Sequence, residues 1–313
     1  MLQNEFRQEN ESSSFIADIG IVNGFKSSIT QKKKSINHLF AKFSKNLQLI
    51  NFDKSEFNLF MEKTNKDTYL KIFGDNLSNS NVKPINNDIL NSGFDFALEN
   101  KKFLLSGGID IYEDLTKLQS DRYQYVLPYF DFSKKLFDMD NGVINLNSSG
   151  NNILDNTNNV KSKIINNIDF KMNDKIIDNL GIKNNFNFYL KNLNSVGKNV
   201  SAYKSSPQVE LQSLFELNSE LPLIKSTELY NQTLIPRLSL RLNPGDMKNH
   251  SDTERKIDMS NIFNINRLGL DDSFESGHSL TTGINYKKEN KKNKENNLEL
   301  KLATVFRDDL ETN

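Results

Sequence analysis

The sequence predicts an all-β fold: an antiparallel transmembrane β-barrel with about fourteen strands in this chain. Three observations support this prediction. Apolar and polar residues alternate along most of the chain, many alternating segments run about 9–13 residues, and none of them has helical spacing. A tilted strand needs about 9–11 residues to cross a bilayer, whereas strands of soluble proteins usually have about 5–6. A soluble sandwich would also leave one face polar, so strand length and number favour the membrane barrel.

The alternation is clearest near the C-terminus. Leu298, Leu300 and Leu302 share one parity, and we expect them to face lipid together with Leu238, Leu240 and Leu242. The strands are expected near residues 14–22, 35–47, 55–63, 67–73, 91–100, 102–113, 121–133, 141–149, 160–172, 181–192, 207–219, 233–243, 276–287 and 296–306.

Residues typical of turns lie between these segments. They include Asn141-Gly142, the stretch from Ser148 to Asn159, residues 196–199 and residues 243–246. Pro128 cannot donate to a strand ladder, so it predicts a bulge or a locally unpaired position. Gly107-Gly108 predicts a bend or a close backbone approach. The tyrosines of residues 121–132 lie on one parity, which fits either a membrane boundary or aromatic packing within a sheet.

Composition excludes several classes of function. Only 36% of the 313 residues are hydrophobic, yet aromatic residues reach 10%, more than a disordered tail would have. Forty basic and forty acidic residues cancel, so no overall field recruits nucleic acid. The absence of cysteine excludes thiolate zinc sites, disulfides and cysteine nucleophiles within this sequence. No window reaches the length of an apolar transmembrane helix.

No constellation of catalytic, cofactor-binding or metal-binding residues stands out. The histidines at positions 38, 250 and 278 are far apart, and none forms a pair with metal-ligand spacing. The acidic residues Asp271, Asp272 and Glu275 are interpreted as part of a solvated loop instead of an acid–base site. We therefore expect a protein without enzymatic activity.

Two stretches resemble a known family. The first is the proline-bearing strand from Leu234 to Pro244, and the second runs from Asp258 to Tyr286. The second holds Asn-Ile-Phe-Asn-Ile-Asn-Arg, then Gly-Leu-Asp, then Glu-Ser-Gly, and ends in Gly-Ile-Asn-Tyr. In this order and spacing they resemble the barrel signature of the LptD family, which assembles lipopolysaccharide in the outer membrane. His278 and Ser273 depart from that signature, which often has basic residues there.

The segment 258–277 is predicted to be a long loop folded back against the barrel, because it carries apolar anchors that a solvated loop would lack: Ile262, Phe263, Ile265, Leu268 and Phe274. Arg267 with Asp271, Asp272 or Glu275 could add charge-assisted bonds.

The resemblance carries further expectations for residues and fold. A structural or partner-contact role is expected for the motif residues Asn266, Arg267, Gly269, Asp272, Glu275 and Gly277. Residues 1–313 should form a single, open part of a larger barrel, without the family's periplasmic N-terminal domain and closing strands. Because no signal peptide precedes the strands, we expect the true start of the protein to lie upstream.

The resemblance also implies a function. A member of this family translocates lipopolysaccharide and inserts it into the outer leaflet of the cell outer membrane. Its partners are lipopolysaccharide, an LptE-like plug lipoprotein, the periplasmic Lpt bridge, which binds the N-terminal domain, and outer-membrane lipid, with no nucleic acid and no cofactor. A generic outer-membrane porin or receptor barrel would use the same polar lining, and a secreted β-rich adhesin is a third class.

Overall fold

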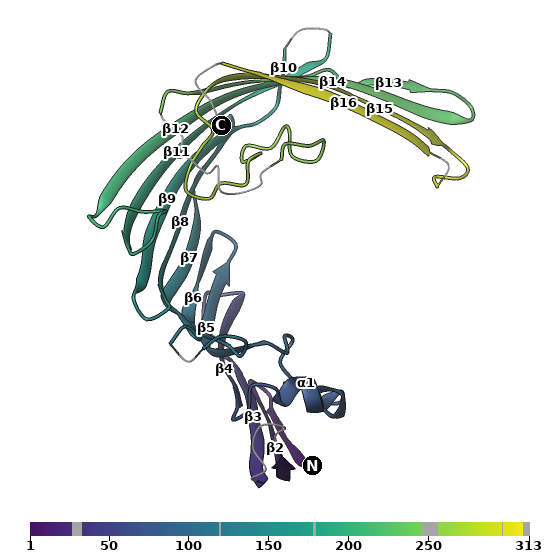
Figure 1. Cartoon of the computed structure of the whole chain (residues 1–313). Helices are drawn as coiled ribbons and strands as arrows, with labels where there is room; N and C mark the ends of the chain where they lie inside the picture. The colour runs from purple at the N-terminus through teal and green to yellow at the C-terminus, as the bar shows by residue number, and fades with distance from the viewer. Residues whose placement is uncertain (27–32, 119, 178–179, 246–255, 296, 309–313) are drawn as a thin grey trace. The chain divides into compact units, whose positions relative to one another are not determined.

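The computed structural model describes residues 1–26, 33–118, 120–177, 180–245, 256–295 and 297–308. It is almost entirely β (Figure 1). The strands are β1 (Leu2–Asn10), β2 (Ser13–Lys26), β3 (Lys33–Asn46), β4 (Lys54–Thr64), β5 (Ile89–Asn100), β6 (Phe103–Asp114), β7 (Tyr123–Met139), β8 (Gly142–Asp155), β9 (Asn159–Met172), β10 (Lys175–Ile177), β11 (Ile182–Lys198), β12 (Gln208–Glu220), β13 (Leu223–Ser226), β14 (Tyr230–Asn243), β15 (Gly277–Asn290) and β16 (Asn297–Arg307).

All strands belong to one antiparallel sheet in which neighbours in the chain are neighbours in the sheet. The order runs from β1 to β16, with the short strands β10 and β13 paired to β11 and β14 beside the main path. β1 and β16 are the two ends of this order, so the sheet is not closed. The predicted all-β, antiparallel fold is confirmed, and thirteen of the fourteen expected strands correspond to strands of the sheet.

One expected strand was wrong. Residues 67–73 contain the helix α1 (Tyr69–Phe73), which the 3-10 helix η1 (Gly74–Leu77) follows directly. A short apolar run does not distinguish a strand from a helical turn by periodicity, and here tertiary packing decides. Among the described residues, no helix has the length and apolar character needed to span a membrane.

The sequence also failed to predict three strands and misplaced one loop. β1 has only two apolar residues, Leu2 and Phe6, and β10 and β13 are very short. The stretch from Ser148 was expected to be a loop, but β8 continues to Asp155. Its Asn-rich composition is a poor guide because amides are well suited to the polar face of a strand that contacts water.

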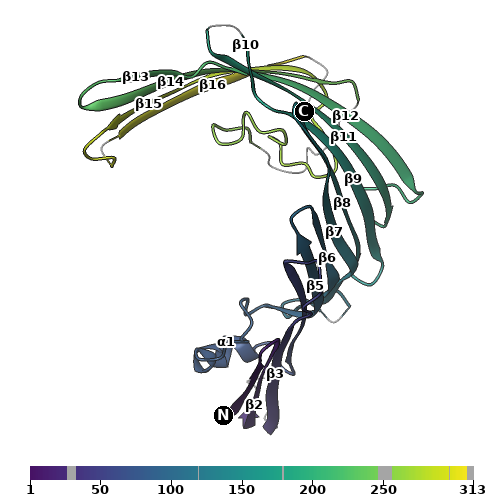
Figure 2. The same ribbon diagram turned by 180° about the vertical axis from the view of Figure 1, so that it is seen from behind.

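The chain forms two compact units. The first contains residues 1–134, 147–164 and 194–209, and the second contains residues 135–146, 165–193 and 210–313. Within the first unit, one face of the sheet presents exposed apolar side chains, such as Ile19, Ile21, Leu59 and Met61. The opposite face of β2 and β3 is covered by residues 65–88, the helical insertion, which includes α1 (Figure 2).

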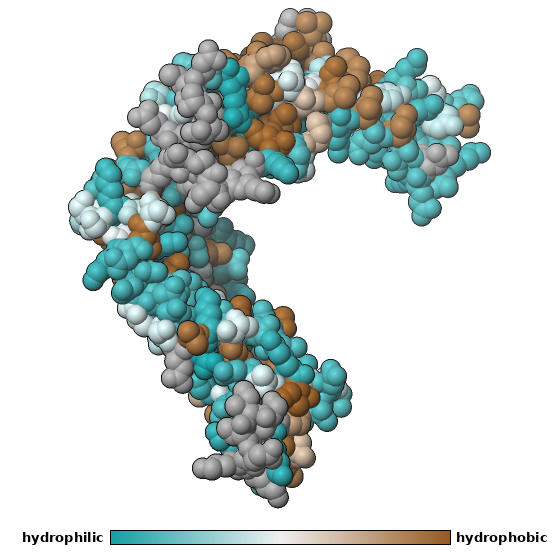
Figure 3. Space-filling model, viewed as in Figure 1, coloured by the Kyte–Doolittle hydropathy of each residue, from teal (hydrophilic) through white to brown (hydrophobic). Residues whose placement is uncertain are grey.

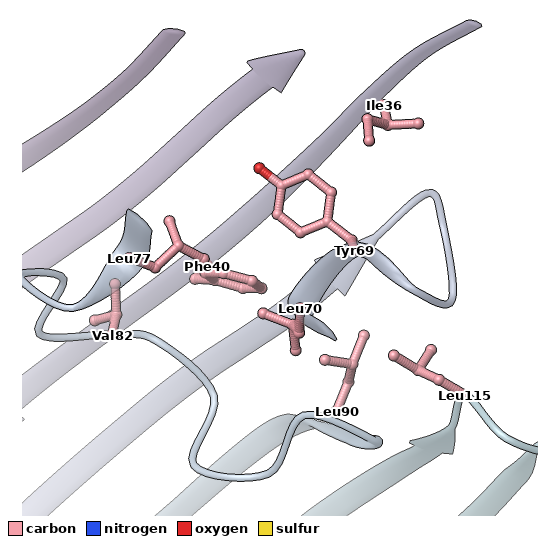
Figure 4. Packing of buried hydrophobic residues seen from close by; sticks show 8 residues of the cluster. All are labelled: Ile36, Phe40, Tyr69, Leu70, Leu77, Val82, Leu90 and Leu115. Atoms are coloured by element: carbon pink, nitrogen blue, oxygen red, sulfur yellow. The ribbon is translucent and has the colours of Figure 1, made fainter. Parts of the chain in front are cut away.

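The helical insertion has an apolar core (Figure 4). Tyr69 and Leu70 from α1 and Leu77 from η1 pack against Phe40 of β3. The remaining members of this cluster are Ile36, Val82, Leu90 and Leu115. Burying side chains of this size contributes about 1.5–3 kcal/mol each, which fastens the insertion to the sheet.

Strand β7 has a bulge at Leu127-Pro128. The register pairs Gly108 with Tyr129 but Asp110 with Val126, so one extra residue lies on β7. The predicted bulge at Pro128 is therefore confirmed. The bulge also reverses the parity, so Tyr129 lies on the face of Gly108 and not on the face of Tyr125. Tyr123 and Tyr125 therefore share one face, where their rings stack, and Tyr129 lies on the other.

The predicted close backbone approach at Gly107-Gly108 is also present. A Cβ atom added at Gly108 would lie 2.2 Å from the carbonyl oxygen of Phe94, and one at Gly107 would lie 2.8 Å from that of Tyr129. Either substitution would force backbone to move, so both positions require glycine.

The second unit has the same two-faced character. The six leucines predicted to face outward are all exposed, between 38% and 60%: Leu238, Leu240, Leu242, Leu298, Leu300 and Leu302. The alternate residues Ser239, Arg241 and Asn243 of β14 are buried on the opposite face. Figure 3 shows apolar residues gathered over β13–β16, with hydrophilic residues at the hairpin tips. This band is what a lipid-facing wall requires.

Candidate functional site

The segment 256–276, here called the polar-face loop, lies against the polar face of the second unit. Its partners come from β11, β12, β14, β15 and β16, of which β11 and β12 are far from it in sequence. Most of the motif residues singled out in the sequence lie on this loop. The expectation that the segment folds back against the sheet is confirmed.

Arg267 is the centre of the loop. Its Nη2 donates to Oε1 of Glu275 at 2.6 Å, and its Nε donates to Oε2 of the same carboxylate. The guanidinium also donates to the hydroxyl oxygens of Ser279 and Thr281 on β15, at 3.0 and 2.9 Å. Arg267 is only 2% exposed, so solvent does not weaken these bonds. A two-pronged, charge-assisted contact fixes orientation as well as distance and holds the loop on β15.

Glu275 is shared between two arginines. In addition to Arg267, it accepts from Nε of Arg307 on β16 at 2.8 Å. Of the three carboxylates that the sequence nominated as partners of Arg267, the structure therefore selects Glu275. The carboxylate links the loop to two strands, and the second cation compensates part of its burial.

A second ion pair lies beside the first. Arg241 of β14 donates from Nε to Oε1 of Glu216 on β12 at 3.0 Å, and both side chains are almost fully buried. Its Nη2 donates to the backbone carbonyls of Phe263 and Asn264, at 3.1 and 2.8 Å. Asn187 adds a bond to the other oxygen of Glu216 at 3.0 Å. The strands thus provide charges that bind the loop's backbone.

The sequence reasoning did not identify Arg241 or Glu216. Each lies on the polar parity of an alternating strand, opposite exposed leucines. Opposite charges on the polar faces of neighbouring strands can indicate an ion pair. That inference requires the strand register, which pairs Glu216 with Arg241.

The region around Phe274 completes the attachment. Its amide donates to Oε1 of Gln212 at 2.8 Å, and Nδ2 of Asn243 donates to the carbonyl of Glu275 at 2.9 Å. Lys191 Nζ donates to the carbonyl of Asp271 at 2.5 Å and lies 4.5 Å from the centre of the Phe274 ring. Polar strand residues thereby satisfy loop backbone groups that burial would otherwise leave unpaired.

The apolar anchors expected in the loop are present. Ile262 and Phe274 are buried, and Phe263, Ile265 and Leu268 are half-buried. Phe274 packs with Tyr189 and Leu214 of the sheet. None of the five is fully exposed, which a freely solvated loop would not achieve.

Three other motif residues shape the loop's backbone. Asn266 accepts the amide of Leu270 through Oδ1 at 2.7 Å, which closes a turn. Gly269 and Gly277 have φ angles of +65° and +73°, a region that strongly favours glycine. A Cβ at Gly277 would also lie 2.3 Å from Oδ1 of Asp308. The backbone carbonyl of Asp272 accepts a 3.5 Å bond from Gln212.

The two positions that depart from the family signature have local partners. His278 Nδ1 lies 2.9 Å from Oδ2 of Asp308, and its amide donates to the same oxygen at 2.8 Å. Ser273 is buried, and its hydroxyl donates to the carbonyl of Phe274 at 3.2 Å.

The first unit contains a buried polar chain that the sequence did not reveal. Tyr69 Oη lies 2.6 Å from Nδ1 of His38, and His38 Nε2 lies 3.2 Å from Oδ1 of Asp18. Gln3 donates to the other oxygen of Asp18 at 2.8 Å. Burial, together with the negative charge of Asp18, raises the pKa of Tyr69 to about 12. Gly20 leaves room for His38, because a Cβ atom at position 20 would lie 2.3 Å from the imidazole ring. The other noted histidine, His250, lies outside the described residues.

The hydrogen bonds and ion pairs around Arg267 attach the polar-face loop to the sheet. Among the described residues, the charged side chains of the Arg267 network bind one another, strand hydroxyl groups or the loop backbone. Across the described residues, no three His, Cys, Asp or Glu side chains are grouped so as to hold a metal ion.

A comparison with protein families decides the identity of the fold. A family model described as LPS transport system D matches residues 41–311. The chain belongs to this family. No curated protein matches the sequence. The LPS transport system D family is a family of outer-membrane β-barrels for lipopolysaccharide transport and assembly, and it is not an enzyme family. The match includes the polar-face loop and residues 65–88 of the helical insertion, but it begins after Ile36 and Phe40, the β3 residues against which the insertion packs.

Proposed function

We propose that this chain forms part of the barrel wall through which lipopolysaccharide is translocated and inserted into the outer leaflet of the cell outer membrane. The observation that carries the proposal is the family match over residues 41–311, in a sheet with one apolar and one polar face. The apolar face suits acyl chains of the surrounding membrane, and the polar face suits a wet lumen.

The polar face supports a passage for sugars and phosphates. Besides its charged residues, it presents amides that bond to neighbouring strands, such as Asn58 with Asp95 and Asn187 with Glu216. Amide and hydroxyl groups exchange hydrogen bonds with sugars at little cost, because each contact is weak and replaceable. Translocation needs many such contacts and no catalytic turnover.

The proposal includes partners of the complete protein. A plug lipoprotein of the LptE kind would occupy the lumen, and a periplasmic bridge would deliver lipopolysaccharide to an N-terminal domain. Two described segments lie on the polar face, the helical insertion and the polar-face loop, and these would contact such a plug.

Depletion of the full-length protein tests the function. Surface lipopolysaccharide is pulse-labelled while the protein is depleted, and uptake of a small hydrophilic solute is measured in the same cells. Loss of labelled lipopolysaccharide from the surface with unchanged solute uptake is expected. Normal surface labelling with reduced solute uptake would favour the porin alternative. Co-purification of a lipoprotein with the full-length barrel tests the plug separately.

A further inference from the structure

A lysine-lined groove lies on the first unit, and the helical insertion contributes none of its lining residues. Its volume is about 740 Å³. It is formed by the loop between β3 and β4, the turn between β5 and β6, and the adjoining part of β7. Its lining residues, here called the lysine groove, are Asn51, Phe52, Asp53, Asn100, Lys101, Lys102, Phe103 and Lys134.

The groove has an excess of unpaired positive charge. Lys101, Lys102 and Lys134 are exposed, and none of them has an acidic partner among the described residues. Asp53 is the single carboxylate in the lining. Three ammonium groups against one carboxylate leave a site that attracts an anion, and lysine donates readily to phosphate oxygens.

An aromatic ridge lies next to these lysines. The ring of Phe103 lies 6.0 Å from that of Phe52 and 5.2 Å from that of Phe132, in edge-to-face contacts. Phe103 is directly opposite Lys134 in the register, and Phe132 is opposite Leu105, so all four share the apolar face. Positive charge therefore meets an apolar surface at one place, as at a lipid headgroup boundary.

Hydrogen bonds between two strand connections hold the lysine groove together. Asn100 Nδ2 donates to the carbonyl of Asn51 at 3.3 Å, and the amide of Asp53 donates to the carbonyl of Glu99 at 2.8 Å. These bonds hold the β3–β4 loop against the β5–β6 turn. Leu49 and Ile50 of the same loop are exposed, which adds apolar surface beside the charges.

The topology places the groove at one edge of the unit. Successive connections of an antiparallel meander alternate between two edges. Residues 11–12, 47–53 and 101–102 connect strands at one edge with short segments, and the long insertion 65–88 lies at the other. Outer-membrane barrels have short turns on the periplasmic side and long loops outside. The groove is therefore at the periplasmic side, where the leaflet consists of phospholipid.

We propose that the lysine groove binds the phosphate headgroup of an anionic phospholipid of the periplasmic leaflet. Lys101, Lys102 and Lys134 donate to the phosphate oxygens, and an acyl chain lies along Phe103 and Phe132. This inference rests on the membrane placement in the proposed function, but not on transport of lipopolysaccharide. It gives the barrel a fixed contact with the leaflet opposite to the one that receives lipopolysaccharide.

The test uses the full-length protein purified in a neutral detergent. Equilibrium binding of phosphatidylglycerol is measured, with diacylglycerol and lipid A as separate arms. The test variant is K101Q/K102Q/K134Q, and the matched control is K291Q/K292Q/K294Q, which removes the same charge from the exposed turn after β15. Each basic residue near an anionic lipid contributes about a five-fold gain in affinity, so the test variant is expected to lose roughly 100-fold.

The outcomes separate the sources of binding. The proposal expects tight phosphatidylglycerol binding that only the test variant loses, with no binding of diacylglycerol. Equal losses in the test and control variants would show general surface attraction and overturn it, as would no loss. Lysine-dependent binding of lipid A without binding of phosphatidylglycerol would also overturn it. Because purified protein is used, failure of lipopolysaccharide delivery in depleted cells leaves this result unaffected.

Discussion

The helical insertion and the polar-face loop are attached to the sheet by different interactions. Each covers the polar face of its own unit, so each must replace the contacts with water that the covered strand residues lose. The insertion packs Leu70 and Leu77 against Phe40 and adds one polar chain through Tyr69. The loop also has apolar anchors such as Phe274, but its centre is the buried ion pair of Arg267 with Glu275.

The strands beneath each segment explain the difference. On β3 the covered face carries Ile36 and Phe40, so apolar side chains from above are stabilised by simple burial. On β12 and β14 the covered face carries Glu216 and Arg241, which would be costly to bury without polar partners. A segment that covers a strand face must therefore match the chemistry of that face. This match determines which kind of substitution detaches the segment.

The largest effect is expected from Arg267→Ala. Removing one member of a buried ion pair costs about 3–5 kcal/mol, and the remaining contact of Glu275 with Arg307 places the loss near the lower value. The loop should then detach while the sheet persists. Limited proteolysis and amide hydrogen exchange over residues 258–276 measure this.

Arg237→Ala is the matched control for that experiment. Arg237 also contacts the loop, since its guanidinium lies 5.9 Å from the centre of the Phe263 ring, and it pairs with Glu220. Both side chains of this ion pair are substantially exposed, so the expected loss is only about 0–1 kcal/mol. Equal protection of the loop in Arg267→Ala and Arg237→Ala would show that the buried ion pair does not hold it.

Leu70→Ala tests the apolar side of the comparison. Truncating a fully buried leucine costs about 2–5 kcal/mol, so the helical insertion should exchange its amides faster. Ile72→Ala on the same short helix is the control, because Ile72 is exposed and should have little effect. If Ile72→Ala were the more damaging of the two, the apolar account of the insertion would be wrong.

A smaller effect is expected on the outer face. Leu240→Arg should cost about 2–4 kcal/mol if Leu240 lies near the bilayer midplane, because a cation there loses its hydration. Asp272→Ala, on the polar-face loop, should be milder since its carbonyl contact survives. The yield of heat-modifiable folded barrel in membranes measures both. If Leu240→Arg were tolerated better than Asp272→Ala, the apolar face of β14 would be exposed to water and not to lipid.

The sequence predicted the strands because a half-exposed strand imposes period two on its own residues. It failed at Tyr69–Phe73, where packing on β3 and not local pattern selects a helix. For the polar-face loop it identified Arg267, Glu275 and the two glycines. It could not identify Arg241, Glu216 or Lys191, because contacts between residues so distant in sequence depend on strand register.

The smallest expected effect is the change in stability when the Tyr69 hydroxyl ionises. Its pKa is about 12 in the folded state and 10.0 unperturbed, so the folded protein holds this proton at pH values where the unfolded chain releases it. The stability that it contributes is complete below pH 10 and is lost as the pH rises toward 12. An ultraviolet phenolate titration of the protein minus that of Tyr69→Phe isolates the group. Ionisation near pH 10 would contradict its burial against His38.

The most direct test of the account examines the two faces of β16. Residues 1–313 contain no cysteine, so Leu300→Cys and Lys301→Cys each add one site for a spin label to this part of the protein. The labels are placed in the full-length protein in its membrane, with any cysteine outside this sequence replaced beforehand. The two side chains are similarly exposed and differ mainly in the face they occupy. A label at 300 should be accessible to oxygen dissolved in lipid and protected from a water-soluble nickel complex, and a label at 301 should show the reverse. Two labels that both meet the nickel complex would contradict a lipid-facing wall.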